Sequence, residues 1–272
     1  MEYRLAGTSP REIEEYQDLL TDVFNIQWSK EYLSWLYKDN PDGNVVGYNA
    51  YHDANIVAHY ATIPIIADVD GKYERGLLSL NTATRPEYSG RGLFTTLANK
   101  TYKFAKKQGY TFVVGVANTN STRGFTSKLG FDLVAPLKVK LGIGFTREIR
   151  EKEGVRFRTY MSQRKQDWRF DQPGNKYFSN KGQSYSPTEY RLINAILSHS
   201  KTSKEIPSKL PSILNLWIGL NPKICWKGTY YFDLPERLKP SPLNLIFKDL
   251  SGLNRKLDKN EVLFELVDFD AY

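Results

Sequence analysis

The sequence is poor in cysteine and has no long apolar segment. Cys225 is the only cysteine among 272 residues, so no intrachain disulfide can form, which suits a reducing compartment. No apolar run approaches the roughly 20 residues that a membrane-spanning helix needs. The N-terminus lacks the charged and apolar regions of a signal peptide. We therefore expect a cytoplasmic protein with no membrane span.

Metal-binding and nucleic-acid-binding motifs are missing as well. The chain has three histidines, and no set of His, Cys and carboxylate residues has metal-ligand spacing. No zinc-finger, RRM or KH signature accompanies the net charge of +8, and no Gly-x-Ser-x-Gly nucleophile elbow is present. The sequence therefore predicts no metal and no nucleic-acid partner, and it leaves the oligomeric state open.

What the sequence does contain is a glycine turn between a strand and a helix. Residues 80–85 resemble the end of a strand, Ser89-Gly90-Arg91-Gly92 forms a turn, and an amphipathic helix starts near Leu93. Glycine lets the backbone approach a ligand closely, and the first N–H groups of a helix have no intrahelical partner. Together with the helix dipole, these groups favour a bound phosphate, although an ordinary strand-to-helix loop would have the same pattern.

The elements around this turn follow a definite order. A helix capped near Ser9 and a second short helix over about residues 29–37 are expected first, and three antiparallel strands follow between residues 45 and 84. After the turn and its helix, the β-branched run 111–117 predicts a buried strand, which ends at Asn118-Thr119-Asn120-Ser121. A short helix and the tripeptide Leu129-Gly130-Phe131 come next. The alternation of strands and helices predicts an α/β protein.

This order resembles the GNAT superfamily of acyl-CoA transferases over about residues 44 to 140. The family's turn is Gln/Arg-x-x-Gly-x-Gly/Ala. Here Pro86-Glu87-Tyr88 leads into Ser89-x-x-Gly92-x-Phe94, so the central glycine matches, while Ser89 and Phe94 do not. Thr126 replaces a tyrosine that many members place four residues before the Gly of Leu-Gly-Phe. The resemblance implies an α/β (α+β) fold with a mixed, mostly antiparallel sheet that splays into a V, and acetyl-CoA as the co-substrate.

The resemblance also implies three groups of cofactor-binding residues. The pyrophosphate would contact backbone N–H groups at the turn, the strand before the turn would polarise the thioester carbonyl, and the pantetheine arm would pass polar residues after the second parallel strand. Turn formation and helix capping are the alternative role of the last group. The pyrophosphate group consists of Gly90, Arg91, Gly92, Leu93 and Phe94. The thioester group consists of Asn81, Thr82 and Thr84, and the pantetheine group of Asn118, Asn120 and Ser121.

An acceptor amine must lose a proton before it attacks, so a general base is expected. His59 is the first candidate, because it lies in the strand expected to face the acceptor and its unperturbed pKa is about 6.5. A hydrogen-bonded, half-buried structural histidine is the alternative. Asp268 and Asp270 alternate on a predicted terminal strand over residues 262–269 and would point to one face. There they could hold the acceptor or lie on a solvated edge.

The second half of the chain contains one imperfect echo of the first. Trp35-Leu-Tyr-Lys-Asp-Asn-Pro-Asp-Gly-Asn recurs as Trp168-Arg-Phe-Asp-Gln-Pro-Gly-Asn, in each case after an expected helix. Unless the likeness is due to chance, it marks the second half as a degenerate copy. No second glycine turn follows Lys140. We therefore expect an acyl-CoA-binding domain over residues 1–144 and a second lobe over residues 145–272 that forms one wall of the acceptor cleft.

Three segments resemble the branch of this family found with surface-polysaccharide biosynthesis, namely Ala58 to Pro64, Leu80 to Tyr88 and Asn118 to Ser121. This resemblance implies N-acetylation of a small-molecule acceptor, an amino sugar that is free or nucleotide-linked. Two alternatives stay open. One is O-acetyl transfer to a sugar hydroxyl, and the other is a non-catalytic acyl-CoA-binding or ligand-binding protein that kept the fold. The departures at Ser89, Phe94 and Thr126 favour the second.

Overall fold

The first two helices begin at capping residues that the sequence supplies. In the computed structural model, the Ser9 hydroxyl accepts from the N–H of Glu12, and the Glu12 carboxylate accepts from the N–H of Ser9, which closes a capping box. Ser29 caps the second helix in the same way, through the N–H of Tyr32. The structure describes residues 1–148, 154–198, 205–209, 213–235, 238–239 and 241–269.

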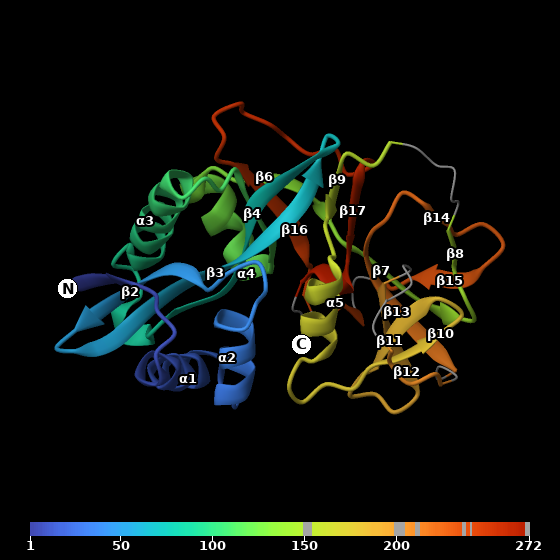
Figure 1. Cartoon of the computed structure of the whole chain (residues 1–272), viewed down its shortest axis with the longest axis horizontal. Coiled ribbons are helices and arrows are strands. Elements are labelled where there is room, and N and C mark those ends of the chain that lie inside the picture. The colour runs from blue at the N-terminus through green and yellow to red at the C-terminus, as the bar shows by residue number, and fades with distance from the viewer. Residues whose placement is uncertain (149–153, 199–204, 210–212, 236–237, 240, 270–272) are drawn as a thin grey trace.

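Strands outnumber helices in the described chain, and the helices pack on the faces of the sheet (Figure 1). None of the helices in the described residues is long and apolar enough to cross a membrane. The helices are α1 (Pro10–Phe24), α2 (Lys30–Tyr37), α3 (Leu93–Lys107), α4 (Thr119–Arg123) and α5 (Gln163–Phe170), with the short helical turns η1 (Pro86–Tyr88), η2 (Gly124–Lys128) and η4 (Leu266–Asp268). The strands are β1 (Glu2–Leu5), β2 (Val46–His52), β3 (Asn55–Val69), β4 (Lys72–Thr84), β5 (Phe112–Ala117), β6 (Asp132–Pro136), β7 (Lys138–Ile143), β8 (Arg147–Glu148), β9 (Phe157–Thr159), β10 (Phe178–Asn180), β11 (Gln183–Pro187), β12 (Ile193–Ser198), β13 (Leu214–Leu220), β14 (Ile224–Cys225), β15 (Tyr230–Asp233), β16 (Asn244–Asp249) and β17 (Val262–Glu265).

The first lobe is a mostly antiparallel sheet that opens at the parallel pair of β4 and β5. β1 to β4 pair antiparallel in chain order, and β4 then pairs parallel with β5. The parallel register runs only from Gly76 opposite Phe112 to Ser79 opposite Gly115. Beyond that point β4 and β5 continue without pairing to each other, so the sheet splays. The expected mixed, mostly antiparallel sheet with a V-shaped opening is confirmed.

The second lobe repeats this strand order. β10, β11 and β12 pair antiparallel, and β12 pairs parallel with β13 from Ile193 opposite Leu214 to Ile196 opposite Trp217. α5 precedes this sheet in the chain as α2 precedes the first one. The indole rings of Trp35 on α2 and Trp168 on α5 stack with centroids 4.4 Å apart. Each indole N–H also donates to the other tryptophan's carbonyl oxygen. The echo between the two halves therefore corresponds to equivalent, face-to-face positions in the structure.

Each lobe contains one strand that the chain connects directly to the other lobe, β16 in the first lobe and β7 in the second, which amounts to a strand exchange. In the first lobe, the order beyond the splay is β5, β16, β6, and in the second it is β13, β7, β15. β6 passes into β7 through Leu137 alone, so the chain leaves one lobe and enters the middle of the other. β16 makes the return crossing. The division at residue 144 stays a prediction, and the exchange shows that it cannot separate two complete sheets.

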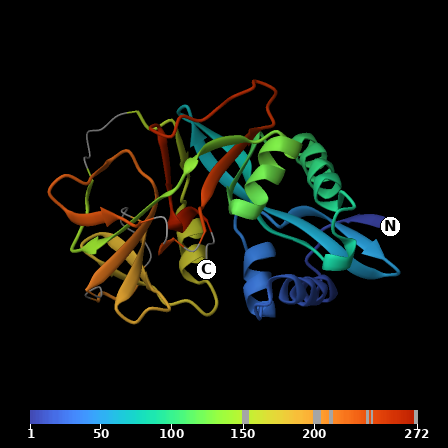
Figure 2. The ribbon, with the colours of Figure 1, turned by 180° about the vertical axis from the view of Figure 1, so that it is seen from behind.

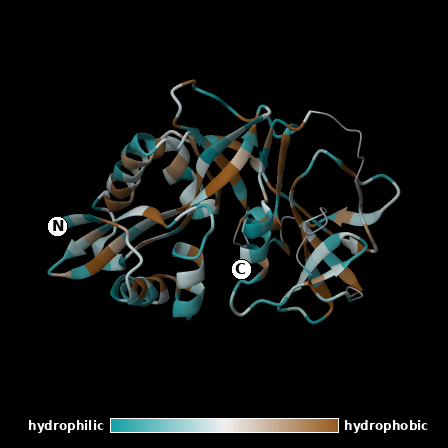
Figure 3. Cartoon of the chain, in the orientation of Figure 1, coloured by the Kyte–Doolittle hydropathy of each residue, from teal (hydrophilic) through white to brown (hydrophobic). Residues whose placement is uncertain are grey.

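One apolar core runs through both lobes. On one face of the first lobe, α1 and α2 pack on β3 and β4, and this cluster continues to Leu197 and Phe264 of the second lobe. A separate cluster packs α3 on the opposite face, which Figure 2 shows from behind. Figure 3 shows the apolar residues concentrated along the central strands. The shared core holds the lobes side by side. The splay opens beyond Ser79, toward the end of β4.

Candidate functional site

The glycine turn forms an open cradle of backbone N–H groups where β4 leads through η1 to α3. Gly90 and Gly92 have φ of 75° and 73°, a left-handed conformation that strains any residue with a side chain. A Cβ at either position would meet nothing within 4 Å. Gly92 is also the N-cap of α3 and supplies no side-chain cap. The helix therefore begins with uncapped donors that face open space, as an anion site requires.

The side chains beside the cradle point away from it. Leu93 is buried in the core beneath α3. The Phe94 ring packs edge-on against Tyr60 and Phe125, and a Cβ on Gly124 would come within 3.1 Å of it. Arg91 lies over the Tyr88 ring and donates to the carbonyl of Glu87. Because backbone groups alone face outward at Leu93 and Phe94, the departure at Phe94 from the small residue of the family pattern does not close the cradle.

A β-bulge lies on β4 next to the splay. Ala61 pairs with Leu80 and His59 pairs with Ala83, so Asn81 and Thr82 together oppose Tyr60. Asn81 has φ of 45°, in the left-handed region. The regular ladder is interrupted at the two residues that were expected to polarise the thioester carbonyl. Thr84, the last of that group, ends β4 and pairs normally with Ala58. The cofactor roles of all three residues stay predictions.

A directed chain of buried hydrogen bonds ends on Asn81. Its Nδ2 donates to the Tyr37 hydroxyl over 3.1 Å, and Tyr37 lies 3.1 Å from Nε2 of His59. Nδ1 of His59 lies 2.6 Å from Oδ1 of Asn49, whose Nδ2 donates to the Tyr16 hydroxyl. Since an amide oxygen can only accept, His59 carries its proton on Nδ1 and Nε2 accepts from Tyr37. The donor and the acceptor of every hydrogen bond in this chain are thereby assigned.

The structure corrects the expected environment of His59. Its side chain is completely buried, its ring stacks on Tyr16, and both ring nitrogens are occupied by Asn49 and Tyr37. Burial lowers the pKa of His59 to about 3, because the imidazolium would lose its hydration. The imidazole is therefore neutral near pH 7 and does not face an open cleft. The structural alternative, a hydrogen-bonded strand histidine, describes this geometry better than a general base does.

The polar residues after β5 cap a helix. Asn118 Oδ1 accepts from the N–H of Ser121, and Ser121 Oγ accepts from the N–H of Asn118, closing a capping box on α4. The capping alternative is thus confirmed for these two side chains. Asn120 is exposed on the first turn of α4. Contact of any of the three with the pantetheine arm stays a prediction.

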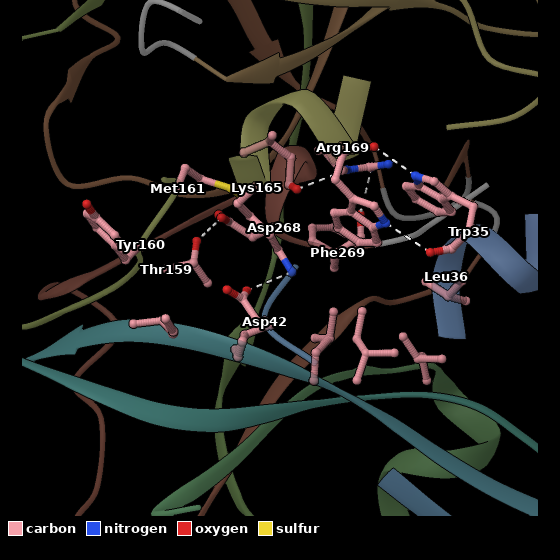
Figure 4. A pocket seen from close by; sticks show the side chains of 17 residues that line it. Trp35, Leu36, Asp42, Thr159, Tyr160, Met161, Lys165, Arg169, Asp268 and Phe269 are labelled. Atoms are coloured by element: carbon pink, nitrogen blue, oxygen red, sulfur yellow. Dashed lines mark hydrogen bonds and ion pairs between the residues drawn. The ribbon is translucent and has the colours of Figure 1, made fainter. Parts of the chain in front are cut away.

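A pocket between the lobes lies on the α2 face of the sheet (Figure 4). Ile63, Leu78 and Leu80 form its floor, and Leu80 directly precedes the bulge. α5 covers it, with Trp168 stacked on Trp35. The free space between these side chains is about 30 Å³, enough for a group of the size of a water molecule or an amine. The second lobe thus contributes one wall of a pocket beside the bulge.

Charged groups close this pocket. Lys165 Nζ lies 2.9 Å from Asp42 and donates to Asn40, and both partners of the ion pair are buried. Burial lowers the pKa of Lys165, while Asp42 opposes that shift. Arg169 donates to backbone carbonyls near the C-terminal end of the described chain. Sequence analysis missed these three residues, because Asp42 resembled an ordinary turn residue and Lys165 and Arg169 have no motif of their own.

Asp268 lies between the lobes but not on a strand. β17 ends at Glu265, and Asp268 belongs to η4, where its carboxylate accepts from the N–H of Glu265 and from the Thr159 hydroxyl. Burial raises the pKa of Asp268 to about 7. The prediction of a terminal strand over residues 262–269 is wrong beyond Glu265, because this capping turns the chain. Asp270 lies outside the described residues. No group of His, Cys, Asp and Glu that could hold a metal occurs in the described part.

One protein-family model matches most of the first lobe. Residues 3–134 match the model of the acetyltransferase (GNAT) domain. No curated protein sequence matches the chain.

Solved structures resemble the chain over both lobes. Eis1 from Mycobacterium abscessus is 10% identical with a TM-score of 0.61, over 92% of this chain and 74% of that one. A probable N-acyltransferase from Enterococcus faecalis V583 is 12% identical with a TM-score of 0.58, over 92% and 73%. The N-myristoyltransferase of Saccharomyces cerevisiae, with bound myristoyl-CoA, is 10% identical with a TM-score of 0.56, over 90% and 82%. At these identities the likeness shows the two-lobed fold alone.

Proposed function

We propose that this chain, whose residues 3–134 match the model of the acetyltransferase (GNAT) domain, is an acyltransferase that acetylates the amine of an amino sugar or nucleotide-linked amino sugar. Its co-substrate is acetyl-CoA, and the cradle of Gly90 and Gly92 fits the pyrophosphate of that molecule because no side chain fills it. One observation carries the proposal. The bulge and the cradle follow each other where β4 splays from β5, and Leu80 beside the bulge lines a pocket that has room for an amine.

The acetyl group arrives as a thioester, and the chain's own residues must orient it and remove a proton from the amine. The interrupted ladder at Asn81 and Thr82 supports their role as donors toward the thioester oxygen. Asp268 suits the proton transfer better than His59 does. Its pKa of about 7 lets it exchange a proton near neutral pH, with the Arg169 guanidinium partly offsetting the effect of burial.

The size of the pocket supports an acceptor whose amine enters while its larger part stays outside. About 30 Å³ admits an amino group but not a sugar ring. The sugar class, and a place in surface-polysaccharide biosynthesis, rest on the resemblance of residues 58–64, 80–88 and 118–121 to that branch of the family. The proposed setting is the cytoplasm, in keeping with a single cysteine.

The test is an acetyl-transfer assay with a panel of acceptors. Purified protein is mixed with acetyl-CoA and glucosamine, UDP-glucosamine or glucose, and release of the free thiol is followed. Treatment of the product with hydroxylamine cleaves an ester and spares an amide, so it separates N- from O-acetylation. We expect thiol release with the amino sugars and a hydroxylamine-resistant product. Release that is equal with and without amino sugar would overturn the proposal, and an ester product would assign O-acetylation instead.

A further inference from the structure

The second lobe contains a larger pocket that adjoins the amine-sized pocket and shares several lining residues with it, namely Thr159, Tyr160, Met161, Val267 and Asp268. It lies under α5, between β9, β11 and β17, and its volume is about 310 Å³, at the lower end of small-molecule sites. Tyr73, at the start of β4, lies at its rim, eight residues from Asn81. At about 3.3 Å per residue along a strand, that is about 26 Å from the bulge. A molecule at this rim is therefore remote from the bulge, whereas the part of the pocket lined by Asp268 adjoins the proposed base.

A buried hydroxyl without a partner lines this pocket. Ser184 on β11 is 1% exposed, and its Oγ has no hydrogen-bond partner. Its neighbour Tyr185 packs with Ile196 and Trp217 in a separate apolar cluster. Ser184 and its register partner Ser198, next to a β-bulge, both line the pocket. An unsatisfied buried polar group is costly, and a ligand hydroxyl would satisfy it.

The charges of the lining disfavour an anionic ligand. Arg158 is the one cation among the lining residues, and its Nε and Nη2 both bond the carboxylate of Asp68. Two carboxylates, those of Glu265 and Asp268, belong to the same wall. The field inside the second-lobe pocket therefore does not attract phosphate, and it suits a neutral or amine-bearing ligand.

Two aromatic rings form the rim. Tyr73 and Tyr160 lie with ring centroids 4.6 Å apart, and they are 64% and 42% exposed. Exposed tyrosines offer an apolar ring with a polar tip, which matches a ligand that alternates C–H faces and hydroxyls.

We propose that the second-lobe pocket binds a saccharide unit, neutral or amine-bearing, that hydrogen-bonds to Ser184 and packs against Tyr73 and Tyr160. The site adjoins the amine-sized pocket through Asp268, and binding there does not require that an amino sugar is acetylated. The unit comes either from a free sugar or from a remote part of an oligomeric acceptor.

The test is saturation-transfer NMR without acetyl-CoA, so that its outcome does not depend on catalysis. The probes are glucose, glucosamine, glucose-6-phosphate and a β-1,4-linked glucosamine tetramer. We expect glucose and glucosamine to bind with dissociation constants on the order of millimolar, as their size implies. Glucose-6-phosphate should bind more weakly. A tetramer that binds no more than a few-fold more tightly assigns the site to a free sugar, and one that binds at least about tenfold more tightly assigns it to an oligomeric acceptor.

Matched variants locate the binding. Ser184→Ala should weaken binding about 2- to 10-fold, the worth of one neutral hydrogen bond, while Ser184→Thr keeps the hydroxyl. Ser186→Ala is the control, because Ser186 is an equally buried serine on the same strand that does not line the pocket. Tyr160→Ala at the exposed rim should also weaken binding, whereas Tyr230→Ala, elsewhere on the same lobe, should not. No binding to the wild type, tighter binding of glucose-6-phosphate, or equal affinities in Ser184→Ala and Ser186→Ala would overturn the proposal.

Discussion

At the scale of single residues, the Tyr37 hydroxyl joins the buried imidazole to the bulge. It accepts from Asn81 and donates to His59, so it fixes the orientation of the Asn81 amide. Tyr37→Phe would leave both partners without a hydrogen bond, at about 1–3 kcal/mol in stability. A displaced Asn81 should lower kcat about 10- to 100-fold. CoA affinity, measured by calorimetry, should not change. Tyr102→Phe is the control, since that buried hydroxyl bonds Tyr60 on the α3 face, and a wild-type kcat in Tyr37→Phe would contradict the positioning role.

If Asp268 is the general base of the acetyl transfer, its protonation gives the pH–rate profile an acidic limb. Its pKa of about 7 means that activity should fall as the pH drops through 7 and the carboxylate is protonated. Asp268→Asn should lower turnover about 10²- to 10⁴-fold and abolish the limb. His59→Gln should keep the limb, because the pKa of His59, about 3, lies below the range measured. A limb that disappears in His59→Gln and persists in Asp268→Asn would return the role of base to His59.

At the scale of elements, α3 supplies a matched pair of glycines. Gly92 at its start and Gly109 after its end both have positive φ and open space around a Cβ. Aspartate at either position costs a similar backbone strain, but only at Gly92 does it place a negative charge in the cradle. Calorimetry should show CoA affinity lost in Gly92→Asp and kept in Gly109→Asp, with circular dichroism unchanged in both. Equal affinities would exclude the cradle as the pyrophosphate site.

The elements that the sequence predicts well are those whose pattern is local. Capping residues place α1 and α2, and the β-branched run before Asn118 places β5. The bulge at Asn81 has no such signal, because it depends on the register with β3. The pKa values of His59 and Asp268 depend on burial by residues far away in the chain, so unperturbed values were the only basis for assigning their roles. The strand exchange is likewise invisible in the sequence, since β16 pairs across more than a hundred residues.

At the scale of the whole molecule, two buried groups oppose each other in the pH dependence of stability. The pKa of His59 is lower in the folded chain than its unfolded value of about 6.5, so this histidine reduces stability as the pH falls below 6.5. The pKa of Asp268 is higher than its unfolded value of about 3.9, so its contribution is present at low pH and lost as the pH rises through 7. Between pH 4 and 6.5 the two slopes cancel.

Removal of either group should reveal the slope of the other. Relative to the wild type, Asp268→Asn should lose about 1.4 kcal/mol of unfolding free energy per pH unit on acidification from 6.5 to 4. His59→Gln should show the opposite trend. Urea unfolding at pH 4.5, 5.5 and 6.5 measures both, and curves parallel to the wild type would refute the opposed pKa shifts.

Residues 1–144 alone should not form a stable CoA-binding domain. They lack β16, whose Leu245, Ile246 and Phe247 are completely buried between β5 and β6. We expect this fragment to aggregate in size-exclusion chromatography and to lose CoA affinity. In the full chain, Ile246→Asp should likewise weaken CoA binding, while Ile143→Asp at a half-exposed position of β7 should not. A monomeric fragment with full CoA affinity would show that the first lobe is independent of the second.

The paired crossings at β6–β7 and before β16 also limit how a molecule can enter. The two connections meet where the N–H of Leu137 donates to the carbonyl of Leu243. Two lobes can open about a hinge when the chain connections between them allow rotation about one axis. Here two connections run between the lobes in opposite directions, and each leads into a paired strand. Rigid opening would tear strands from both sheets. A ligand that enters the amine-sized pocket without such opening must pass the lining side chains, among which Trp35 and Trp168 are held by stacking and by two reciprocal hydrogen bonds.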